Sequence, residues 1–145
     1  MPDERPLIDA YPYRTEITTR WMDNDVYGHI NNVAYYSFFD TAANRFLIER
    51  GGLDISRGAV IGLVVESKCA YHAPLAYPAT LRAGVRVDHL GRRAVTYGMA
   101  IFDERDDRAA AHGHLVHVFV DRESRSPTSI PDTLRAALLS IARPV

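Results

Sequence analysis

The sequence lacks the residues and segments on which several classes of protein depend. Its 145 residues include a single cysteine, Cys69, so one chain can form neither an internal disulfide nor a cluster of thiolate metal ligands. No stretch approaches the ~20 consecutive apolar residues of a membrane-spanning helix. The start, MPDERPLIDA, has neither the basic end nor the apolar middle of a signal peptide. We therefore expect a cytoplasmic protein with no membrane partner.

An excess of charge of one sign is also missing. Seventeen Lys and Arg residues face eighteen Asp and Glu residues, which gives a formal net charge of -1 at pH 7. Proteins that bind nucleic acid depend on a basic field, so we expect no nucleic-acid partner. Lys68 is the only lysine, so contacts with anions would come from the forked guanidinium groups of arginine. The length and the 47% of hydrophobic residues fit one globular domain, residues 1–145, with one core.

Two kinds of periodicity predict an α+β domain. Residues 33–50 carry apolar side chains at helical spacing and predict a long amphipathic helix, capped by Asn31 or Asn32 and ended by Gly51 and Gly52. The strands that we predict cover residues 13–21, 59–71, 80–88, 94–102 and 110–120, with short connections between the last four. We expect residues 1–12 to be a loose lead-in and residues 131–142 to hold a short closing helix. The apolar face of the long helix must pack on the apolar face of the sheet.

A polar loop lies just before the predicted long helix. It places carboxylates and one imidazole beside a helix N-terminus, where unpaired N–H groups and the helix dipole favour negative charge. Such a place can hold an oxyanion, and it favours the ionised form of a carboxylate that acts as nucleophile or general base. Gly28 allows a tight turn or a close approach of the backbone to a substrate. Asp23, Asn31 and Asn32 have the simpler interpretation of turn and cap residues.

These loop residues resemble a family motif. The signature of the 4-hydroxybenzoyl-CoA thioesterase-like branch of the hotdog-fold thioesterases is similar to Asp23-x-Asp25-x-x-Gly28-His29-Ile30-Asn31-Asn32-x-x-Tyr35. The resemblance covers roughly residues 13–122, and the order of the predicted elements agrees with it. It implies a hotdog fold, in which a strongly curved antiparallel sheet wraps around one long central helix. We therefore expect a sheet of about five to six strands, within the usual range for a domain.

The resemblance also implies hydrolysis of an acyl-CoA thioester without a metal or an organic cofactor. In the family the second aspartate of the motif is the nucleophile or general base, and that position is Asp25. Backbone N–H groups at the helix start, from Asn31 through Asn32 to Val33, would stabilise the oxyanion, where one donor lowers the barrier by ~3 to 4 kcal/mol. The other candidate site residues are His29 as an assisting group, Gly28 in the loop, and Tyr27 and Tyr35 in the substrate pocket, with Tyr36 and Phe39 as further walls.

The resemblance further implies a homodimer or homotetramer with the active site between subunits. Pairing edge strands across a twofold axis would remove a row of unpaired N–H and C=O groups. The phosphates of CoA need cationic contacts, and the candidates are Arg92 and Arg93 at a predicted hairpin tip. Arg82 and Arg86 on the neighbouring strand are weaker candidates.

Two other functions remain open. The motif is also similar to that of plant acyl-carrier-protein thioesterases, but those have an asparagine two residues after the aspartate, where this chain has Tyr27. A hotdog protein that only binds acyl-CoA or an aromatic ligand would gain nothing from a carboxylate at Asp25. We expect no metal site at His112, His114 and His117, because in a strand His117 points away from the other two.

Overall fold

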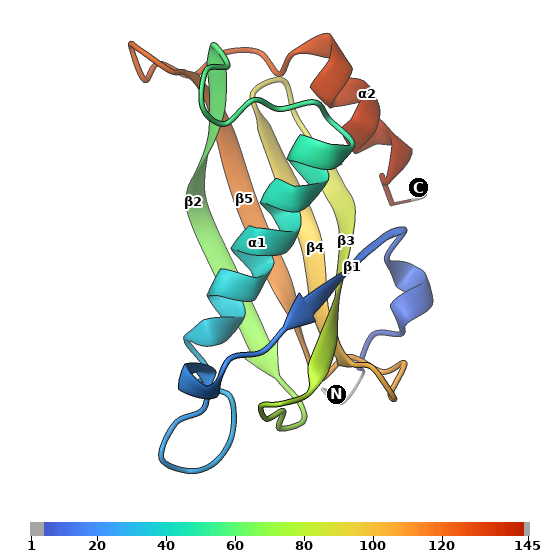
Figure 1. Cartoon of the computed structure of the whole chain (residues 1–145). Helices are drawn as coiled ribbons and strands as arrows, with labels where there is room; N and C mark the ends of the chain where they lie inside the picture. The colour runs from blue at the N-terminus through green and yellow to red at the C-terminus, as the bar shows by residue number, and fades with distance from the viewer. Residues whose placement is uncertain (1–4, 144–145) are drawn as a thin grey trace.

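Five antiparallel strands form one curved sheet, and a long helix lies across its hollow face (Figure 1). The computed structural model describes residues 5–143. The elements are η1 (Ile8–Ala10), β1 (Tyr13–Thr18), η2 (Trp21–Asp23), α1 (Ala34–Glu49), β2 (Val60–Tyr71), β3 (Thr80–Leu90), β4 (Ala94–Asp103), β5 (Ala111–Asp121) and α2 (Asp132–Ser140). The strands lie in the order β1-β3-β4-β5-β2, and neighbours are antiparallel. The predicted α+β class and the wrapped central helix are confirmed.

The aromatic face of α1 forms the centre of the core. Phe39, Ala42 and Phe46 are completely buried, and their spacing of three and four residues places them on one side of the helix. The sheet meets them with alternating side chains, of which Leu81 and Val85 of β3 are examples with no exposed surface. Among residues 5–143 neither helix combines the length and the apolar character that crossing a bilayer requires.

The two ends of α1 differ in how closely they follow the prediction. The N-cap is Val33, which makes no side-chain cap, rather than the predicted Asn31 or Asn32; Asn31 lies two residues earlier, and its Oδ1 accepts a hydrogen bond from the N–H of Val33 at 3.0 Å. At the other end the N–H of Gly51 donates to the carbonyl of Leu47 at 3.0 Å, and Gly52 adopts a φ of 69°. Because other residues rarely adopt this backbone conformation, the glycine pair ends the helix as predicted. The first strand is shorter than we predicted, because residues 21–23 form the turn η2.

The first described residues are packed against the sheet, contrary to the loose lead-in that we expected over residues 1–12. Tyr11 is only 1% exposed, and its ring meets Phe102 edge-on at 5.9 Å. The Arg86 guanidinium lies 4.9 Å from the centre of the same ring. Gly84 makes this approach possible, because a Cβ there would lie 2.7 Å from Cγ of Tyr11. The segment therefore covers the outer face of β3 and β4, while residues 1–4 lie outside the described part.

Strand β2 is an edge of the sheet, paired only with β5. Leu63, Val64 and Val65 in its middle are 36%, 46% and 60% exposed. The register with β5 shifts between Val64 and Glu66, which leaves Val65 without a paired residue. The unpaired backbone groups of an edge strand beside exposed apolar side chains form a surface on which another strand can pair.

One histidine of β5 is buried in the core. His117 is 1% exposed, and its Nδ1 lies 3.0 Å from the hydroxyl oxygen of Tyr97. His112 and His114 point to the opposite face, where they contact His72 at 2.7 Å and Glu66 at 2.6 Å. The predicted alternation of the three histidines is therefore confirmed.

The burial of His117 makes the stability of the fold depend on pH. Burial lowers the pKa of His117 from 6.5 to about 4. Between these values the unfolded chain binds a proton that the folded protein does not, so stability is lost as pH falls through this window. Lowering the pH from 7 to 4 should cost about 3 kcal/mol through this group. Urea unfolding of His117→Gln should show a pH-dependent loss smaller by that amount.

A matched substitution of an exposed histidine controls for the other groups that titrate in this range. His89 is exposed near the end of β3, and His89→Gln should retain the pH-dependent loss of the unchanged protein. Equal losses in the unchanged protein and in His117→Gln would contradict the assignment to His117.

Candidate active site

The polar loop before α1 closes on itself. Asn24 and Ile30 form an isolated antiparallel bridge at its base. Within it, the N–H of Asp25 donates to the carbonyl of His29 at 2.9 Å, and the N–H of Gly28 donates to the carbonyl of Asp25 at 3.1 Å. Gly28 has a φ of 84°, a conformation that favours glycine. The tight turn thus needs the glycine that the sequence provides.

Asp25 borders a cavity at the end of the sheet where α1 begins and β2 ends. Its carboxylate is half-buried, and Oδ1 accepts the N–H of Tyr27 at 2.9 Å. The cavity is lined by Asp25, Ile30, Asn32, Tyr35, Tyr71, His72, Ala73 and Pro74. Asp25 is the only acidic residue in this lining, so it is the carboxylate there that can act as a base or nucleophile.

One backbone N–H just before α1 has no hydrogen-bond partner among residues 5–143. The N–H of Asn31 donates to the carbonyl of Asp23 at 2.8 Å, and that of Val33 donates to the side chain of Asn31. The N–H of Asn32 makes no hydrogen bond within residues 5–143. Among the N–H groups of residues 31–33, only that of Asn32 is without a hydrogen bond in the described residues, and Asn32 is one of the residues that line the cavity.

Two residues that the sequence analysis passed over also line the cavity. Tyr71 donates its hydroxyl to the carbonyl of Asn32 at 3.0 Å, and its ring meets Tyr35 edge-on at 5.1 Å. Burial raises the pKa of Tyr35 to about 12 and raises the pKa of Tyr71 as well, so both are neutral phenols at neutral pH. His72 follows β2 and contacts His112. The position of Tyr71 depends on which face of β2 meets α1, and alternation along the strand is the only local signal for it.

Three predicted site residues with exposed side chains lie outside this cavity, as do Gly28 and Asn31 of the loop. Tyr27 is 83% exposed and borders a second hollow, which it shares with Asp25. The side chain of His29 is exposed and makes no hydrogen bond to a described residue. Val33 is also exposed. Within one chain these side chains face solvent, so the structure does not bring them to the cavity around Asp25.

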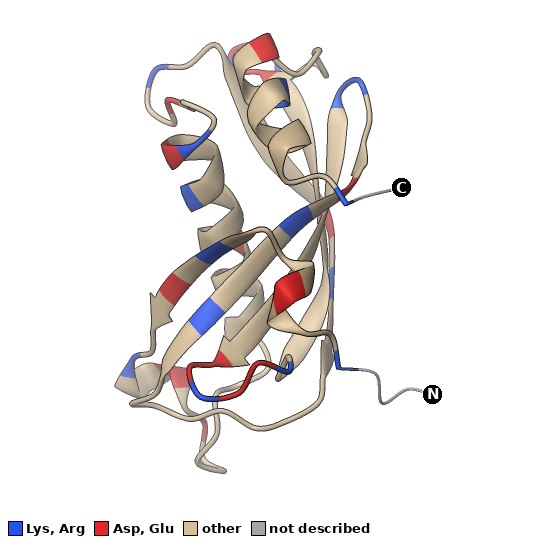
Figure 2. Cartoon of the chain, turned by 90° about the vertical axis from the view of Figure 1, so that its right-hand side faces the viewer, with Lys and Arg blue, Asp and Glu red and all other residues tan. Residues whose placement is uncertain are grey.

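The candidate CoA-binding arginines lie at the other end of the sheet. Arg92 and Arg93 are exposed at the tip between β3 and β4 (Figure 2). The loop that carries Asp25 lies beyond the opposite end of β3 (Figure 1). Eleven residues of extended strand span ~36 Å, which separates the two places. The structure therefore does not bring Arg92 and Arg93 close to Asp25 of the same chain.

Arg82 and Arg86, the weaker candidates, make contacts within the fold. Arg82 Nη1 donates to Oδ1 of Asp107 at 3.2 Å. Arg86 Nε donates to Oδ1 of Asp88 at 2.8 Å, and its guanidinium stacks on Tyr11. These contacts tie together the outer face of the sheet and the segments that cover it, so they give no support to a role in CoA binding.

Known proteins share this fold, and some of them are similar in sequence. A family model described as the thioesterase-like superfamily matches residues 19–138. The PA5185 protein from Pseudomonas aeruginosa strain PAO1 is 54% identical over 96% of this chain and 97% of that chain, with a TM-score of 0.94. The PA2801 protein from Pseudomonas aeruginosa is 28% identical over 89% and 98%, with a TM-score of 0.81. No curated protein compared with the chain matches it.

A more distant relative shows the same fold. Slr0204, a 1,4-dihydroxy-2-naphthoyl-CoA thioesterase from Synechocystis, is 16% identical over 89% of this chain and 96% of that chain, with a TM-score of 0.78. The family match includes the loop with Asp25, the long helix and all of β2 to β5. The predicted relationship to hotdog-fold thioesterases is confirmed, and the chain belongs to the thioesterase-like superfamily.

Proposed function

We propose that the protein hydrolyses acyl-CoA thioesters with Asp25 as nucleophile or general base. The observation that carries the proposal is that Asp25 and Asn32 line one cavity and that the N–H of Asn32 makes no hydrogen bond to a described residue. Acyl transfer needs a base or nucleophile and an oxyanion donor within reach of one carbonyl group. Membership of the thioesterase-like superfamily supports thioester hydrolysis, and the CoA thioester named for the Synechocystis relative supports a CoA substrate.

Two routes lead to the same products. In the first, a carboxylate oxygen of Asp25 attacks the thioester carbonyl, CoA leaves as the thiolate, and water hydrolyses the resulting anhydride. In the second, Asp25 takes a proton from a water molecule, and the oxygen of that water attacks the carbonyl. Both routes pass through an oxyanion that the N–H of Asn32 stabilises, and both end in the free acid and CoA. His29 as an assisting group belongs to the same proposal.

A second copy of the chain completes the site in this proposal. The open edge of β2 and the exposed Leu63, Val64 and Val65 support a dimer in which two β2 strands pair across a twofold axis. Such a partner would lie beside the cavity at the end of β2. It would also cover exposed side chains of the loop, Tyr27 among them.

The same dimer would allow Arg92 and Arg93 to bind CoA. Antiparallel pairing of β2 turns the partner end over end, so the partner's β3–β4 tip would lie at the end of the sheet where this chain has Asp25. The two guanidinium groups could then bind the phosphates of a CoA whose thioester lies in the cavity. An acylated carrier protein in place of CoA, and a cytoplasmic location, remain predictions.

Asp25→Asn should remove the activity and leave the fold intact. The amide keeps an acceptor for the N–H of Tyr27, but it can neither attack a carbonyl nor take a proton from water. We expect kcat to fall at least ~100-fold, the size of effect typical for loss of a general base. The assay is thiol release from short, medium, long and aryl acyl-CoA thioesters, with Cys69 counted as background.

Asp40→Asn is the matched control for that experiment. Asp40 is an exposed carboxylate on α1 whose removal should leave kcat unchanged. Full activity of Asp25→Asn would refute the role of Asp25. Hydrolysis of an acylated carrier protein alone would replace CoA as the substrate, and binding of acyl-CoA without turnover would make the protein a binding protein.

Val65→Arg should break the proposed dimer. Val65 is exposed on the β2 edge, and twofold symmetry would bring two arginines close together in the interface. Sedimentation equilibrium should show self-association at least ~10-fold weaker, because a like-charge contact in an interface costs several kcal/mol. Leu139→Arg, an equally exposed apolar position on α2, should leave the dimer unchanged. A monomeric unchanged protein would contradict the assembly.

The double variant Arg92→Ala, Arg93→Ala should weaken binding of CoA thioesters specifically. We expect KM for acyl-CoA to rise ~10-fold with kcat unchanged, the pattern for loss of contacts made equally in ground and transition states. KM for the matching acyl-N-acetylcysteamine, which has no phosphate, should stay the same. Arg105→Ala, Arg108→Ala in the β4–β5 connection is the control of equal charge, and equal effects of the two doubles would contradict a specific site.

A further inference from the structure

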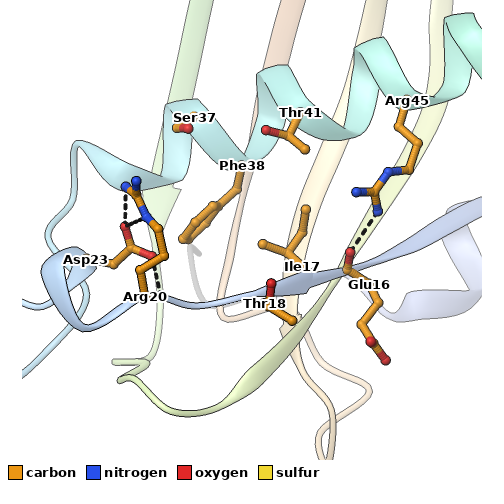
Figure 3. A pocket seen from close by; sticks show the side chains of 9 residues that line it. All are labelled: Glu16, Ile17, Thr18, Arg20, Asp23, Ser37, Phe38, Thr41 and Arg45. Carbon is orange, nitrogen blue, oxygen red and sulfur yellow. Dashed lines mark hydrogen bonds and ion pairs between the residues drawn. The ribbon is translucent and has the colours of Figure 1, made fainter.

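A buried carboxylate lies directly before the loop that carries Asp25. Asp23 is 3% exposed, and its side chain accepts three hydrogen bonds, all from Arg20 (Figure 3). Oδ2 accepts the backbone N–H of Arg20 at 2.8 Å, and Oδ1 accepts Nε at 3.1 Å and Nη2 at 2.8 Å. A buried charge is costly unless it is paired and hydrogen-bonded, so Arg20 is what allows Asp23 to stay inside.

The backbone of Asp23 joins the two sides of the loop. Its N–H donates to the carbonyl of Arg20 at 2.9 Å, which closes the turn η2. Its carbonyl accepts the N–H of Asn31 at 2.8 Å. Asp25 lies two residues after Asp23, and Asn32 directly follows Asn31. The backbone of Asp23 is therefore two residues from the proposed catalytic carboxylate and is hydrogen-bonded to the residue before the proposed oxyanion donor.

The loop has few other supports. The side chains of residues 26–29 are exposed, so the apolar packing of the loop is confined to its base, where Ile30 is 5% exposed and belongs to the core. Besides the bond to Asp23, hydrogen bonds connect the loop to the rest of the chain. The N–H of Ile30 donates to the carbonyl of Leu75 at 2.7 Å, and Oδ1 of Asn24 accepts the N–H of Tyr77 at 3.0 Å. Both of these lead to the β2–β3 connection, whereas the carbonyl of Asp23 accepts the N–H of Asn31, three residues before α1 begins.

We propose that Asp23, held by the forked guanidinium of Arg20, is a positioning residue that sets the placement of the Asp25 carboxylate relative to the Asn32 N–H. The inference rests on the proposed function. It adds a role for Arg20 and Asp23, neither of which takes part in the reaction steps proposed above. The Arg20 side chain is 67% exposed, so it acts through its hydrogen bonds rather than through packing. Without them the turn η2 loses the group that neutralises its buried carboxylate.

Arg20→Gly with added guanidinium tests this role. A displacement of about 1 Å can cost ~100-fold in rate, so we expect kcat to fall ~10- to 100-fold while KM changes less than about three-fold. Guanidinium at millimolar concentration should restore most of kcat by occupying the vacated place beside Asp23. A merely structural loss of stability would not respond in this way, since guanidinium destabilises folded proteins.

The single tryptophan gives a readout that needs no substrate. Trp21 lies in η2 between Arg20 and Asp23, and its ring meets Tyr77 edge-on at 5.9 Å. Its fluorescence emission should shift in Arg20→Gly and return with guanidinium. Arg20→Lys, which keeps the charge but not the fork, should restore the activity only in part.

Arg45→Gly is the matched control. Arg20, Asp23 and Arg45 line one cavity between β1 and α1, which is distinct from the cavity beside Asp25 (Figure 3). Arg45 Nη1 donates to Thr15 Oγ1 at 2.6 Å and to the carbonyl of Glu16 at 2.9 Å, and it makes no hydrogen bond to Asp23. Guanidinium should change neither the kcat nor the Trp21 emission of this variant.

The inference is overturned if Arg20→Gly keeps its kcat, or if guanidinium restores neither kcat nor emission. Failure of the proposed function looks different, because the unchanged protein would then hydrolyse no thioester in the panel. In that case the positioning role falls with the proposed function, and the emission of Trp21 reports only whether the Arg20–Asp23 contact holds η2 in place.

Discussion

The aromatic face of α1 is the constraint on which the rest of the structure depends. Phe39 and Phe46 have no exposed surface, and a flat sheet would leave so broad a helix face partly in water. The sheet curves around the helix instead (Figure 1), and this brings the end of β2 to the start of α1, where Tyr71 bonds to the carbonyl of Asn32. The cavity beside Asp25 follows from the way in which the helix is covered.

The parts of the fold with a local signal could be predicted from the sequence. The long helix has apolar residues at helical spacing and a glycine pair at its end, and β3 alternates cleanly. The packing of Tyr11 has no such signal, because Gly84 and Phe102 are distant in the chain and become neighbours only through the register of β3 with β4. Because the first residues are rich in proline and charge, we predicted a loose segment there, although the side chains of Ile8 and Tyr11 are buried.

The candidate site also has a part that the sequence predicts and a part that depends on the tertiary structure. A motif of neighbouring residues was enough to single out Asp25 and the helix start. It could not show which N–H would remain free, because that depends on the loop closing so that Asn31 bonds to Asp23 and at the same time accepts the N–H of Val33. The separation of Arg92 from Asp25 is likewise a matter of strand direction and length, which a local pattern does not contain.

The two ends of the described chain are hydrogen-bonded to different parts of the fold (Figure 1). Arg5 Nε donates to the carbonyl of Ala109 at 2.7 Å, and the N–H of Arg143 donates to the carbonyl of Val87 at 2.7 Å. Arg143 is thus anchored to β3, whereas Arg5 is anchored to the β4–β5 connection, next to Ala110, whose carbonyl accepts the N–H groups of His72 and Ala73 in the cavity lining. A solid support linked through the segment after Arg143 would therefore hold the protein on the β3 side and leave the β2 edge open, whereas a link before Arg5 would approach the cavity.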